Sequence, residues 1–351
     1  MHRDSMTPRE RWQAVLSGGK PDRIPLDYRA TDEATTKLLA HLRCSRDEMY
    51  ERLHIDKVVS VAPRYAGPPV AADADVFGCR YNEVDYGSGS YRECVYHPLA
   101  QYGSVDEIEA NYHWPDPDWW DYATIREQVV GKEHWPISGG GSEPFLTYTH
   151  LRGQEQANID LIENPGMVHY CLGKLYDLCY INSRRIYEQI PGKVLITWVA
   201  EDLGSQESLL YSPRQIREFF LPHMKRMMEL VHQAGAYVIT HSDGAVRAII
   251  PDLIAIGMDV LDPVQWRCKG MGREGLKRDF GDKIAFHGAM DNQYTLAFGS
   301  EEEIRQEVED NIRILGSDGR FILGPCHNIQ PITPPERVVA MYEEAYAQGW
   351  L

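Results

Sequence analysis

Two side chains in the second half of the chain are of the types that bind zinc, and both stand at the end of an apolar run. His241 follows Tyr237-Val238-Ile239-Thr240, and Cys326 follows a second such run. An imidazole and a thiolate are soft ligands, and a carboxylate can complete such a set. Asp243 and Glu201 are the candidates for that third ligand. Three protein ligands leave one position open, which predicts Lewis-acid activation of a bound oxygen or sulfur atom.

Asp243 is the better placed of the two carboxylates. It follows His241 by two residues and, if the strand pattern continues, it points to the same face. Its side chain is short, so Glu201 from the adjacent strand is kept as the alternative ligand. Both soft ligands also have a purely structural interpretation, Cys326 as a buried thiol at a strand end and His241 as a hydrogen-bonding imidazole of the core.

Other polar side chains follow the same apolar runs and predict a single cleft. Asp, Asn and Ser beside glycine are ordinary turn formers and helix caps, but turns do not require His, Cys, Gln and Glu. Barrel enzymes place their sites at the carboxyl ends of the strands, so we expect these groups to line one mouth. The candidate catalytic residues are Asp202, His287 and Asp291, and the candidate substrate-binding residues are Tyr28, Arg29, Gln206, Asp262, Gln265 and Asn328.

Short β-branched or apolar runs that alternate with helical patterns must position these residues. Helix start signals are clear at Ser212-Pro213 and at Ser300-Glu301-Glu302-Glu303. Alternation predicts an α/β fold with a parallel sheet, and eight units predict closure into a (β/α)₈ TIM barrel, with residues 1–351 as a single domain. An open, doubly wound sheet is the alternative. The eight predicted strands are 23–28, 56–62, 135–140, 193–200, 236–241, 258–263, 283–288 and 320–325.

The second and third predicted strands are separated by a long segment, about 63–134, rich in Tyr, Gly, Asp and Trp. Within it, 81–86 and 91–96 alternate like the strands of a β-hairpin around Gly87-Ser88-Gly89. We interpret this insertion as a lid over the barrel mouth. A surface excursion that only packs on the barrel is the alternative.

Composition excludes several classes of function. The 36 basic and 52 acidic side chains give a formal net charge of −16, which would repel nucleic acid and anionic lipid surfaces. No apolar run approaches the roughly 18 residues that span a bilayer, and the first residues lack the apolar stretch of a signal peptide. The seven cysteines include no C-x-x-C pair, so we expect reduced thiols and a cytoplasmic protein.

Two common catalytic or binding motifs are missing. Gly139-Gly140-Gly141-Ser142 lacks the Lys-Ser/Thr of a phosphate-binding loop, and no Gly-x-Ser-x-Gly is present to indicate a serine hydrolase.

Several longer motifs, taken together, resemble the uroporphyrinogen decarboxylase superfamily. The resemblance covers nearly the whole chain, becomes stronger from Glu201 onward, and implies a barrel with its active site at the carboxyl ends of the strands. The motifs are Met6-Thr7-Pro8-Arg9-Glu10-Arg11, Lys20-Pro21-Asp22-Arg23-Ile24-Pro25, Leu210-Tyr211-Ser212-Pro213, His241-Ser242-Asp243-Gly244, Asp262-Pro263-Val264-Gln265 and Thr333-Pro334-Pro335-Glu336.

The superfamily contains two chemistries, and this chain resembles one of them more closely. Authentic decarboxylases hold the carboxylates of a porphyrinogen with an arginine-rich segment, for which this chain has Leu26-Asp27-Tyr28-Arg29-Ala30-Thr31 with a single arginine. Corrinoid-linked methyltransferases bind zinc through His-x-Cys-Gly and a later Cys, and His241 and Cys326 match two of these ligands. Asp243 replaces the first Cys, and a carboxylate makes the zinc harder and better suited to an ether oxygen.

The resemblance therefore implies a zinc-dependent methyltransferase of the O-demethylase type. It would move a methyl group from a small methoxylated or methylated donor to a corrinoid carried by a partner protein, or to a related acceptor. A uroporphyrinogen III decarboxylase-type lyase is the first alternative, and a non-catalytic tetrapyrrole or corrinoid binder is the second. An aromatic pocket for a methoxyarene could be drawn from Tyr28, Trp114, Trp119, Trp198 or Trp266, each of which could equally belong to the core.

Overall fold

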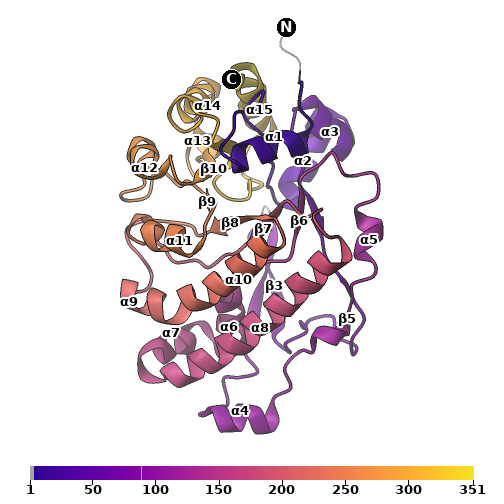
Figure 1. The fold of residues 1–351 in the computed structure, drawn as a ribbon, viewed down its shortest axis with the longest axis vertical. Coiled ribbons are helices and arrows are strands. Elements are labelled where there is room, and N and C mark those ends of the chain that lie inside the picture. The colour runs from indigo at the N-terminus through magenta and orange to yellow at the C-terminus, as the bar shows by residue number, and fades with distance from the viewer. Residues whose placement is uncertain (1–3, 88) are drawn as a thin grey trace.

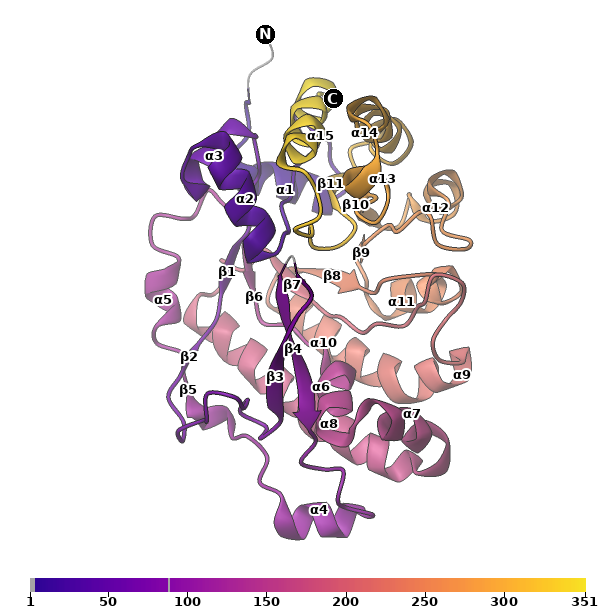
Figure 2. The same cartoon turned by 180° about the vertical axis from the view of Figure 1, so that it is seen from behind.

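A curled parallel sheet forms the centre of the computed structural model, which describes residues 4–87 and 89–351 (Figures 1 and 2). Its strands fall in seven of the eight predicted runs, and each pairs in parallel with the next. In order across the sheet they are β1 (Val59–Val61), β6 (Ile137–Gly139), β7 (Ile196–Trp198), β8 (Tyr237–His241), β9 (Val260–Asp262), β10 (Ala285–Met290) and β11 (Phe321–Pro325).

The first predicted strand, 23–28, is an extended segment that makes one parallel bridge to the central sheet, between Leu26 and Leu323 of β11, and one antiparallel bridge, between Arg23 and Trp350. It nevertheless joins the two edges of the sheet, because Asp27 N–H donates to Leu323 O (2.8 Å) and Leu26 O accepts from Asp56 N–H (2.8 Å) just before β1. Two features shorten the ladder: Pro25 has no N–H, and the Leu26 N–H donates to the Asp56 carboxylate (2.9 Å). The predicted barrel architecture is thus confirmed, with its first strand reduced.

Helices cover the outside of the sheet. The predicted starts at Ser212 and Ser300 are confirmed as capping boxes. The helix that begins after Ser212 contains a π-helical turn over Ile216–Phe220 between two α-helical parts, α9 and α10. The covering helices are α1 (Pro8–Leu16), α2 (Asp32–Leu42), α3 (Arg46–Arg52), α6 (Pro144–Arg152), α7 (Gln154–Glu163), α8 (Pro165–Gln189), α9 (Pro213–Gln215), α10 (Leu221–Gln233), α11 (Ile250–Ile256), α12 (Arg273–Phe280), α13 (Thr295–Phe298), α14 (Glu301–Leu315) and α15 (Pro335–Gln348), with a 3₁₀ turn at Arg247–Ile249.

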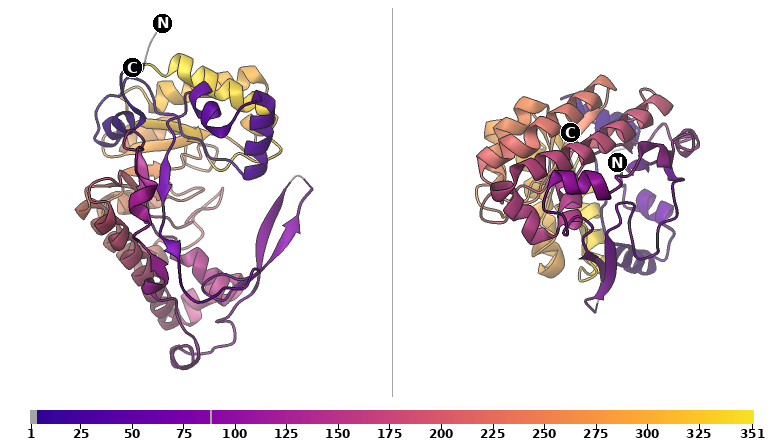
Figure 3. Two further views of the ribbon diagram at one scale, coloured as in Figure 1. Left: turned by 90° about the vertical axis from the view of Figure 1, so that its right-hand side faces the viewer. Right: turned by 90° about the horizontal axis from the view of Figure 1, so that it is seen from below.

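The segment between β1 and β6 contains the predicted hairpin, formed by β3 (Arg80–Asp85) and β4 (Ser90–Tyr96); Ser88 of the predicted turn lies outside the described residues. The hairpin is an arm that stands away from the barrel (Figure 3). At its base His97 contacts the backbone of α6, and at its tip Ser90 N–H donates to Glu33 of α2. The segment also contains β2 (Arg64–Tyr65), α4 (Val105–Asn111), a 3₁₀ turn (Pro117–Trp119), β5 (Trp120–Asp121) and α5 (Ile125–Gln128).

The amino ends of the strands are closed by α1. Trp12 is fully buried and packs with one residue from each of several strands, among them Ile196, Ile239 and Ile322. This layer fills the barrel interior, as expected for a barrel with a packed core. The opposite, carboxyl end is therefore the end that is open for a site. In the described part of the chain, no helix has the length and apolar character needed to cross a bilayer.

A buried ion-pair network also lies at the amino end. Asp56 is fully buried between the Arg11 and Arg23 guanidinium groups, which are also buried. Its carboxylate accepts from Arg23 Nη1 at 2.8 Å and from the Leu26 N–H, which therefore makes no hydrogen bond to a neighbouring strand. Asp56 therefore fixes the segment that joins the two edges of the sheet.

We expect Asp56→Ala to lower the free energy of unfolding by about 3–5 kcal/mol, because two buried guanidinium groups lose the one fully buried carboxylate that they share and keep only Asp22 and Asp4. Urea titration followed by circular dichroism measures this loss. Asp47→Ala is the matched control, since Asp47 pairs with Lys57 at the surface with its side chain 83% exposed and should leave stability almost unchanged. Equal effects of the two substitutions would contradict a special role for Asp56.

Candidate active site

The parallel register of β8 and β9 places His241 opposite Asp262 at the carboxyl end of both strands. His241 Nδ1 lies 2.6 Å from Asp262 Oδ2. The same carboxylate accepts from Arg29 at 2.7 and 3.1 Å and from His287 Nδ1 at 2.5 Å. Burial alone would raise the pKa of Asp262, but Arg29 and His287 hold it well below its usual range. Asp262 is thus a buried anion that positions three side chains, and it has no surface left for substrate.

His287 lies entirely inside the protein, between two carboxylates. Its Nδ1 contacts Asp262 and its Nε2 lies 3.0 Å from Asp27 Oδ2, so both ring nitrogens must carry a proton to donate. Burial lowers the pKa of His287, but the charge of Asp262 and the hydrogen bonds raise it above the ordinary value. The prediction that His287 is catalytic therefore does not fit its position, because the imidazolium has no exposed surface from which to reach a substrate.

Above this network, His241 faces two further carboxylates. Ligand atoms of Asp202, His241 and Asp243 all lie within 4.8 Å of one another, and no other group of this kind occurs in residues 4–87 and 89–351. Since Asp262 occupies Nδ1, the free His241 nitrogen is Nε2, which lies 4.0 Å from Asp202 Oδ1. Burial would lower the pKa of His241, but Asp262 raises it to about 9. A carboxylate behind the imidazole of a metal ligand is the usual supporting contact.

The chemistry of this donor set fits a divalent metal ion. One imidazole and two carboxylates are ligands that Zn²⁺ accepts, and they leave a position open. Asp243 Oδ1 is buried without a hydrogen-bond partner, which a bound cation would satisfy. Asp202, for which the sequence predicted a catalytic role, thus joins His241 and Asp243 as a candidate ligand.

The structure places the other two predicted ligands elsewhere. The Glu201 carboxylate is buried, where it accepts from Phe145 N–H (3.1 Å) and Tyr176 OH (2.9 Å), and burial raises its pKa to about 8. The Cys326 thiol is buried and donates to Val264 O at 3.4 Å, and burial raises its pKa well above the ordinary value. Neither side chain belongs to the group around His241, because each makes its hydrogen bonds within the core.

Two further predicted residues, Asp291 and Tyr28, make contacts that are structural. Asp291 caps the turn that leads into α13, accepting from Gln293 N–H and Thr295 N–H, and pairs with Arg267. The Tyr28 hydroxyl contacts Thr35 Oγ1 at 3.0 Å, and its ring packs against Tyr50 and Tyr342 in the core. These positions do not fit the catalytic role predicted for Asp291 or the substrate contact predicted for Tyr28.

The mouth contains a cavity of about 250 Å³ beside His241, Arg29, Trp198 and Asn328. Glu143 and His327 also line it, although sequence reasoning did not select them. His327 lies between Cys326 and Asn328, which the sequence did indicate. Glu143 follows the third predicted strand, directly after Gly139-Gly140-Gly141-Ser142, and this glycine run indicated only that a phosphate-binding loop is absent. An adjoining cavity of about 540 Å³ shares His327 with the first and is lined by Gln206, Asp243 and Gln265, among others.

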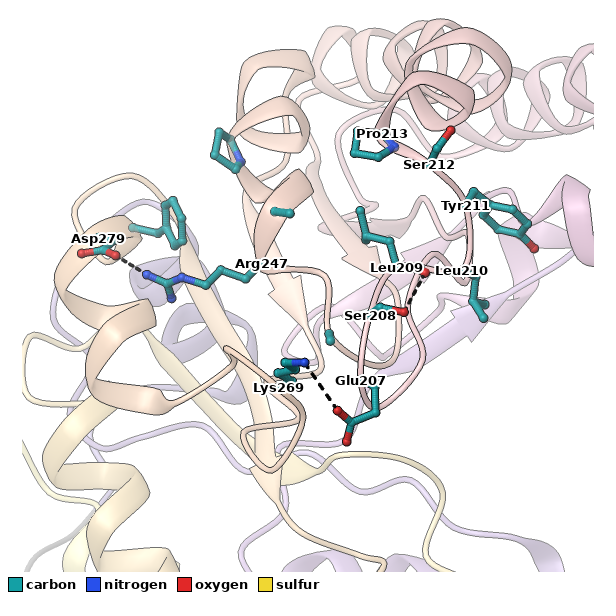
Figure 4. A pocket seen from close by; sticks show the side chains of 14 residues that line it. Glu207, Ser208, Leu209, Leu210, Tyr211, Ser212, Pro213, Arg247, Lys269 and Asp279 are labelled. Atoms are coloured by element: carbon teal, nitrogen blue, oxygen red, sulfur yellow. Dashed lines mark hydrogen bonds and ion pairs between the residues drawn. The ribbon is translucent and has the colours of Figure 1, made fainter.

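A larger cavity, about 820 Å³, lies apart from this mouth and shares no lining residue with either mouth cavity (Figure 4). Its charged side chains pair with one another: Arg247 with Asp279, and Lys269 with Glu207 at 3.8 Å. The candidate ligands and their neighbours are therefore not gathered in this larger cavity.

The mouth is strongly acidic. Glu143, Asp202 and Asp243 approach one another closely enough that the two aspartates help burial to raise the pKa of Glu143. Among the described residues, Arg29 is the one Lys or Arg that lines either mouth cavity. Its guanidinium is already neutralised by Asp262, with Asp27 at 3.7 Å. A substrate with several carboxylates would therefore meet no unpaired lysine or arginine among the described residues that line these two cavities.

Comparison with known proteins places this site in a family context. The sequence model of "Uroporphyrinogen decarboxylase (URO-D)" matches residues 122–348. A uroporphyrinogen decarboxylase of Anaeromyxobacter is 30% identical over 65% of this chain and 61% of its own length, and the chloroplastic uroporphyrinogen decarboxylase 2 of Arabidopsis thaliana is 32% identical over 60% and 48%. The chain thus matches less than two thirds of the length of these relatives. A methyltransferase from Methanosarcina mazei shares the fold, with a TM-score of 0.68, 18% identity and coverage of 98% of this chain and 99% of its own.

We expect His287→Gln to destabilise the protein by about 3–5 kcal/mol at pH 6, since two buried carboxylates lose their shared cation. The pKa of His287 is higher in the folded than in the unfolded chain, so its contribution is fully present below the unfolded value, about 6.5, and is lost as pH rises through the folded value. Urea titrations at pH 6 and at alkaline pH should show the difference from wild type shrinking. His41→Gln, at an exposed position, is the control. A loss that does not change with pH would mean that His287 is neutral.

Proposed function

The chain belongs to the uroporphyrinogen decarboxylase family, and from this premise we propose that it is a metal-dependent methyltransferase and not a porphyrinogen decarboxylase. Its donor would be a small methoxylated or methylated molecule, and its acceptor a corrinoid carried by a partner protein or a related group. The observation that carries the proposal is the group of Asp202, His241 and Asp243 at the mouth, with Asp262 behind the imidazole.

Each residue of this group has a definite task. Asp262 holds the His241 ring so that Nε2 points to the mouth, and Arg29 and His287 keep Asp262 ionised. A Zn²⁺ ion held by Nε2 and the two carboxylates would supply an electrophile for the donor oxygen. When a methyl group leaves an ether or alcohol oxygen as an electrophile, the electron pair of the broken bond stays on that oxygen. Ligands that hold a hard cation therefore suit an oxygen-linked methyl donor.

The curated relatives favour the alternative, because those compared above are named uroporphyrinogen decarboxylases. The charge of the mouth argues against it. Each charge-assisted hydrogen bond to a carboxylate contributes about 1.5–3 kcal/mol, and Arg29 already donates two hydrogen bonds to Asp262, which neutralises its charge. A substrate with many carboxylates would meet Glu143, Asp202 and Asp243 without compensation. The third possibility is a non-catalytic protein that binds a tetrapyrrole or corrinoid. Such a protein would not require Asp202, His241 and Asp243 to lie together at the mouth.

We expect one zinc ion per chain after reconstitution, measured by plasma mass spectrometry. His241→Ala and Asp243→Ala should each lose most of the metal, because each removes one of three ligands, whereas Cys326→Ala should retain it. Asp262→Asn should weaken zinc binding about 10- to 100-fold, the usual cost of losing the group behind a ligand. A wild-type protein that stays free of metal would rule out this mechanism, and loss of zinc in Cys326→Ala would restore the ligand set predicted from the sequence.

We expect no turnover of uroporphyrinogen under anaerobic conditions, since no unpaired lysine or arginine among the described residues lines the mouth to hold its carboxylates. Coproporphyrinogen can be followed by chromatography after oxidation of the products. Methylation of added cob(I)alamin by methoxylated phenols, followed by absorbance, is the parallel assay, and His241→Ala should abolish it. Coproporphyrinogen formed at an enzymatic rate would make the decarboxylase the correct assignment.

A further inference from the structure

A side chamber of about 390 Å³ opens next to the mouth cavity. The two hollows share Glu143, Trp198 and Ala200 as lining residues, so they meet at these side chains. His241 lies on the mouth side of this boundary, and the side chamber lies on the other. A molecule that placed one atom near His241 could therefore place its remainder in the chamber.

The glycines after β6 give the chamber its shape. Gly140 has φ +73° and packs against Ser183, where an added Cβ would lie 2.7 Å from the hydroxyl oxygen. Gly141 has φ +129°, and an added Cβ would lie 2.7 Å from the backbone oxygen of Trp198. Both positions thus require glycine. The loop passes close to β7, and Ser142 N–H donates to Trp198 O at 3.1 Å. Gly140 and Gly141 therefore form part of the chamber wall.

The chamber wall is mainly apolar and has one unused polar group. Leucines from α6 and α8 and the aromatic side chains of Phe77 and Trp198 are its large apolar residues. Ser142 is 8% exposed, and its hydroxyl has no hydrogen-bond partner in the structure. A buried hydroxyl without a partner costs free energy that a ligand oxygen can recover. The complete lining is Phe77, Gly140, Gly141, Ser142, Glu143, Pro144, Leu146, Thr147, Leu175, Leu178, Cys179, Trp198 and Ala200.

The charges around the chamber restrict what it can hold. Glu143 is its one charged lining residue, and Asp202 and Asp243 lie close to Glu143. No lysine or arginine lines the chamber among the residues that the structure describes. A ligand carboxylate would therefore be repelled, whereas a neutral ring with a hydroxyl or ether oxygen meets apolar walls, two aromatic side chains and the Ser142 hydroxyl.

We propose that the side chamber binds the ring of the methyl donor, and that the donor is an uncharged single-ring aromatic methyl ether with a second oxygen beside the methoxy group. The inference rests on the proposed function, because it places the methoxy group at the mouth beside His241. A volume of about 390 Å³ falls in the range of small-molecule sites. Ser142 hydrogen-bonds the second oxygen, while Trp198 and Phe77 contact the ring.

The separate cavity of about 820 Å³, shown in Figure 4, supplies the control for this proposal. It is lined by Leu210, whose side chain is exposed, and its charged residues are paired with one another. Leu178→Trp fills the side chamber, and Leu210→Trp makes the same substitution in the other cavity. Ser142→Ala removes the unused hydroxyl with very little change of volume, so it remains informative if Leu178→Trp fails to fold.

Isothermal titration calorimetry with 2-methoxyphenol, on zinc-reconstituted and on metal-free protein, tests the proposal. We expect binding to both forms, weakened about threefold to tenfold by Ser142→Ala and at least about tenfold by Leu178→Trp, and unchanged in Leu210→Trp. 4-Methoxybenzoate should bind at least about tenfold more weakly than 2-methoxyphenol, because its carboxylate would be buried among apolar walls with no lysine or arginine beside it among the described residues.

The outcomes separate this inference from the proposed function. Unchanged affinity in both chamber variants, or loss in Leu210→Trp alone, overturns the chamber as the binding site. Tighter binding of 4-methoxybenzoate overturns the uncharged donor. If the protein binds zinc and demethylates methanol but does not bind 2-methoxyphenol, the inference fails and the methyltransferase stands. If 2-methoxyphenol binds the chamber and no zinc is retained, the chamber stands and the metal mechanism fails.

Discussion

The site depends on one buried carboxylate. Asp262 has no exposed surface, yet it stays ionised because Arg29, His241 and His287 surround it. A buried anion is tolerated only when it is paired and hydrogen-bonded on all sides. The arrangement joins β8 and β9 to β10 and to the extended segment before α2. One side chain therefore connects the closure of the barrel with the orientation of the imidazole that faces the mouth.

The sequence could predict the fold because its signals are local. Alternating apolar runs and capping residues located seven parallel strands and the helices between them, and the hairpin was visible in its alternation. The first strand was less predictable. Its residues favour extended structure, but Pro25 lacks an N–H and Leu26 gives its N–H to Asp56, a residue thirty positions later in the chain. Such a contact depends on tertiary structure and leaves no periodic signal in the sequence.

The difference between local signals and tertiary contacts also explains which site residues could be predicted. His241 and Asp243 could be predicted because they lie two residues apart at one strand end, where their types and spacing indicate a shared site. Cys326 and Glu201 were chosen by type, and type does not say whether a side chain points into the mouth or is held by Val264 O or Tyr176 OH. His287 illustrates the limit further. A histidine at a strand end is compatible with catalysis, but two carboxylates facing its two nitrogens make it a fixed cation of the core.

The arm formed by β3 and β4 is held at both ends. At its base His97 contacts the backbone of α6, and at its tip Ser90 N–H donates to Glu33 of α2. The arm can therefore swing on its base only after the hydrogen bond at its tip breaks, and the exposed Tyr86, Tyr91 and Tyr96 would move with it.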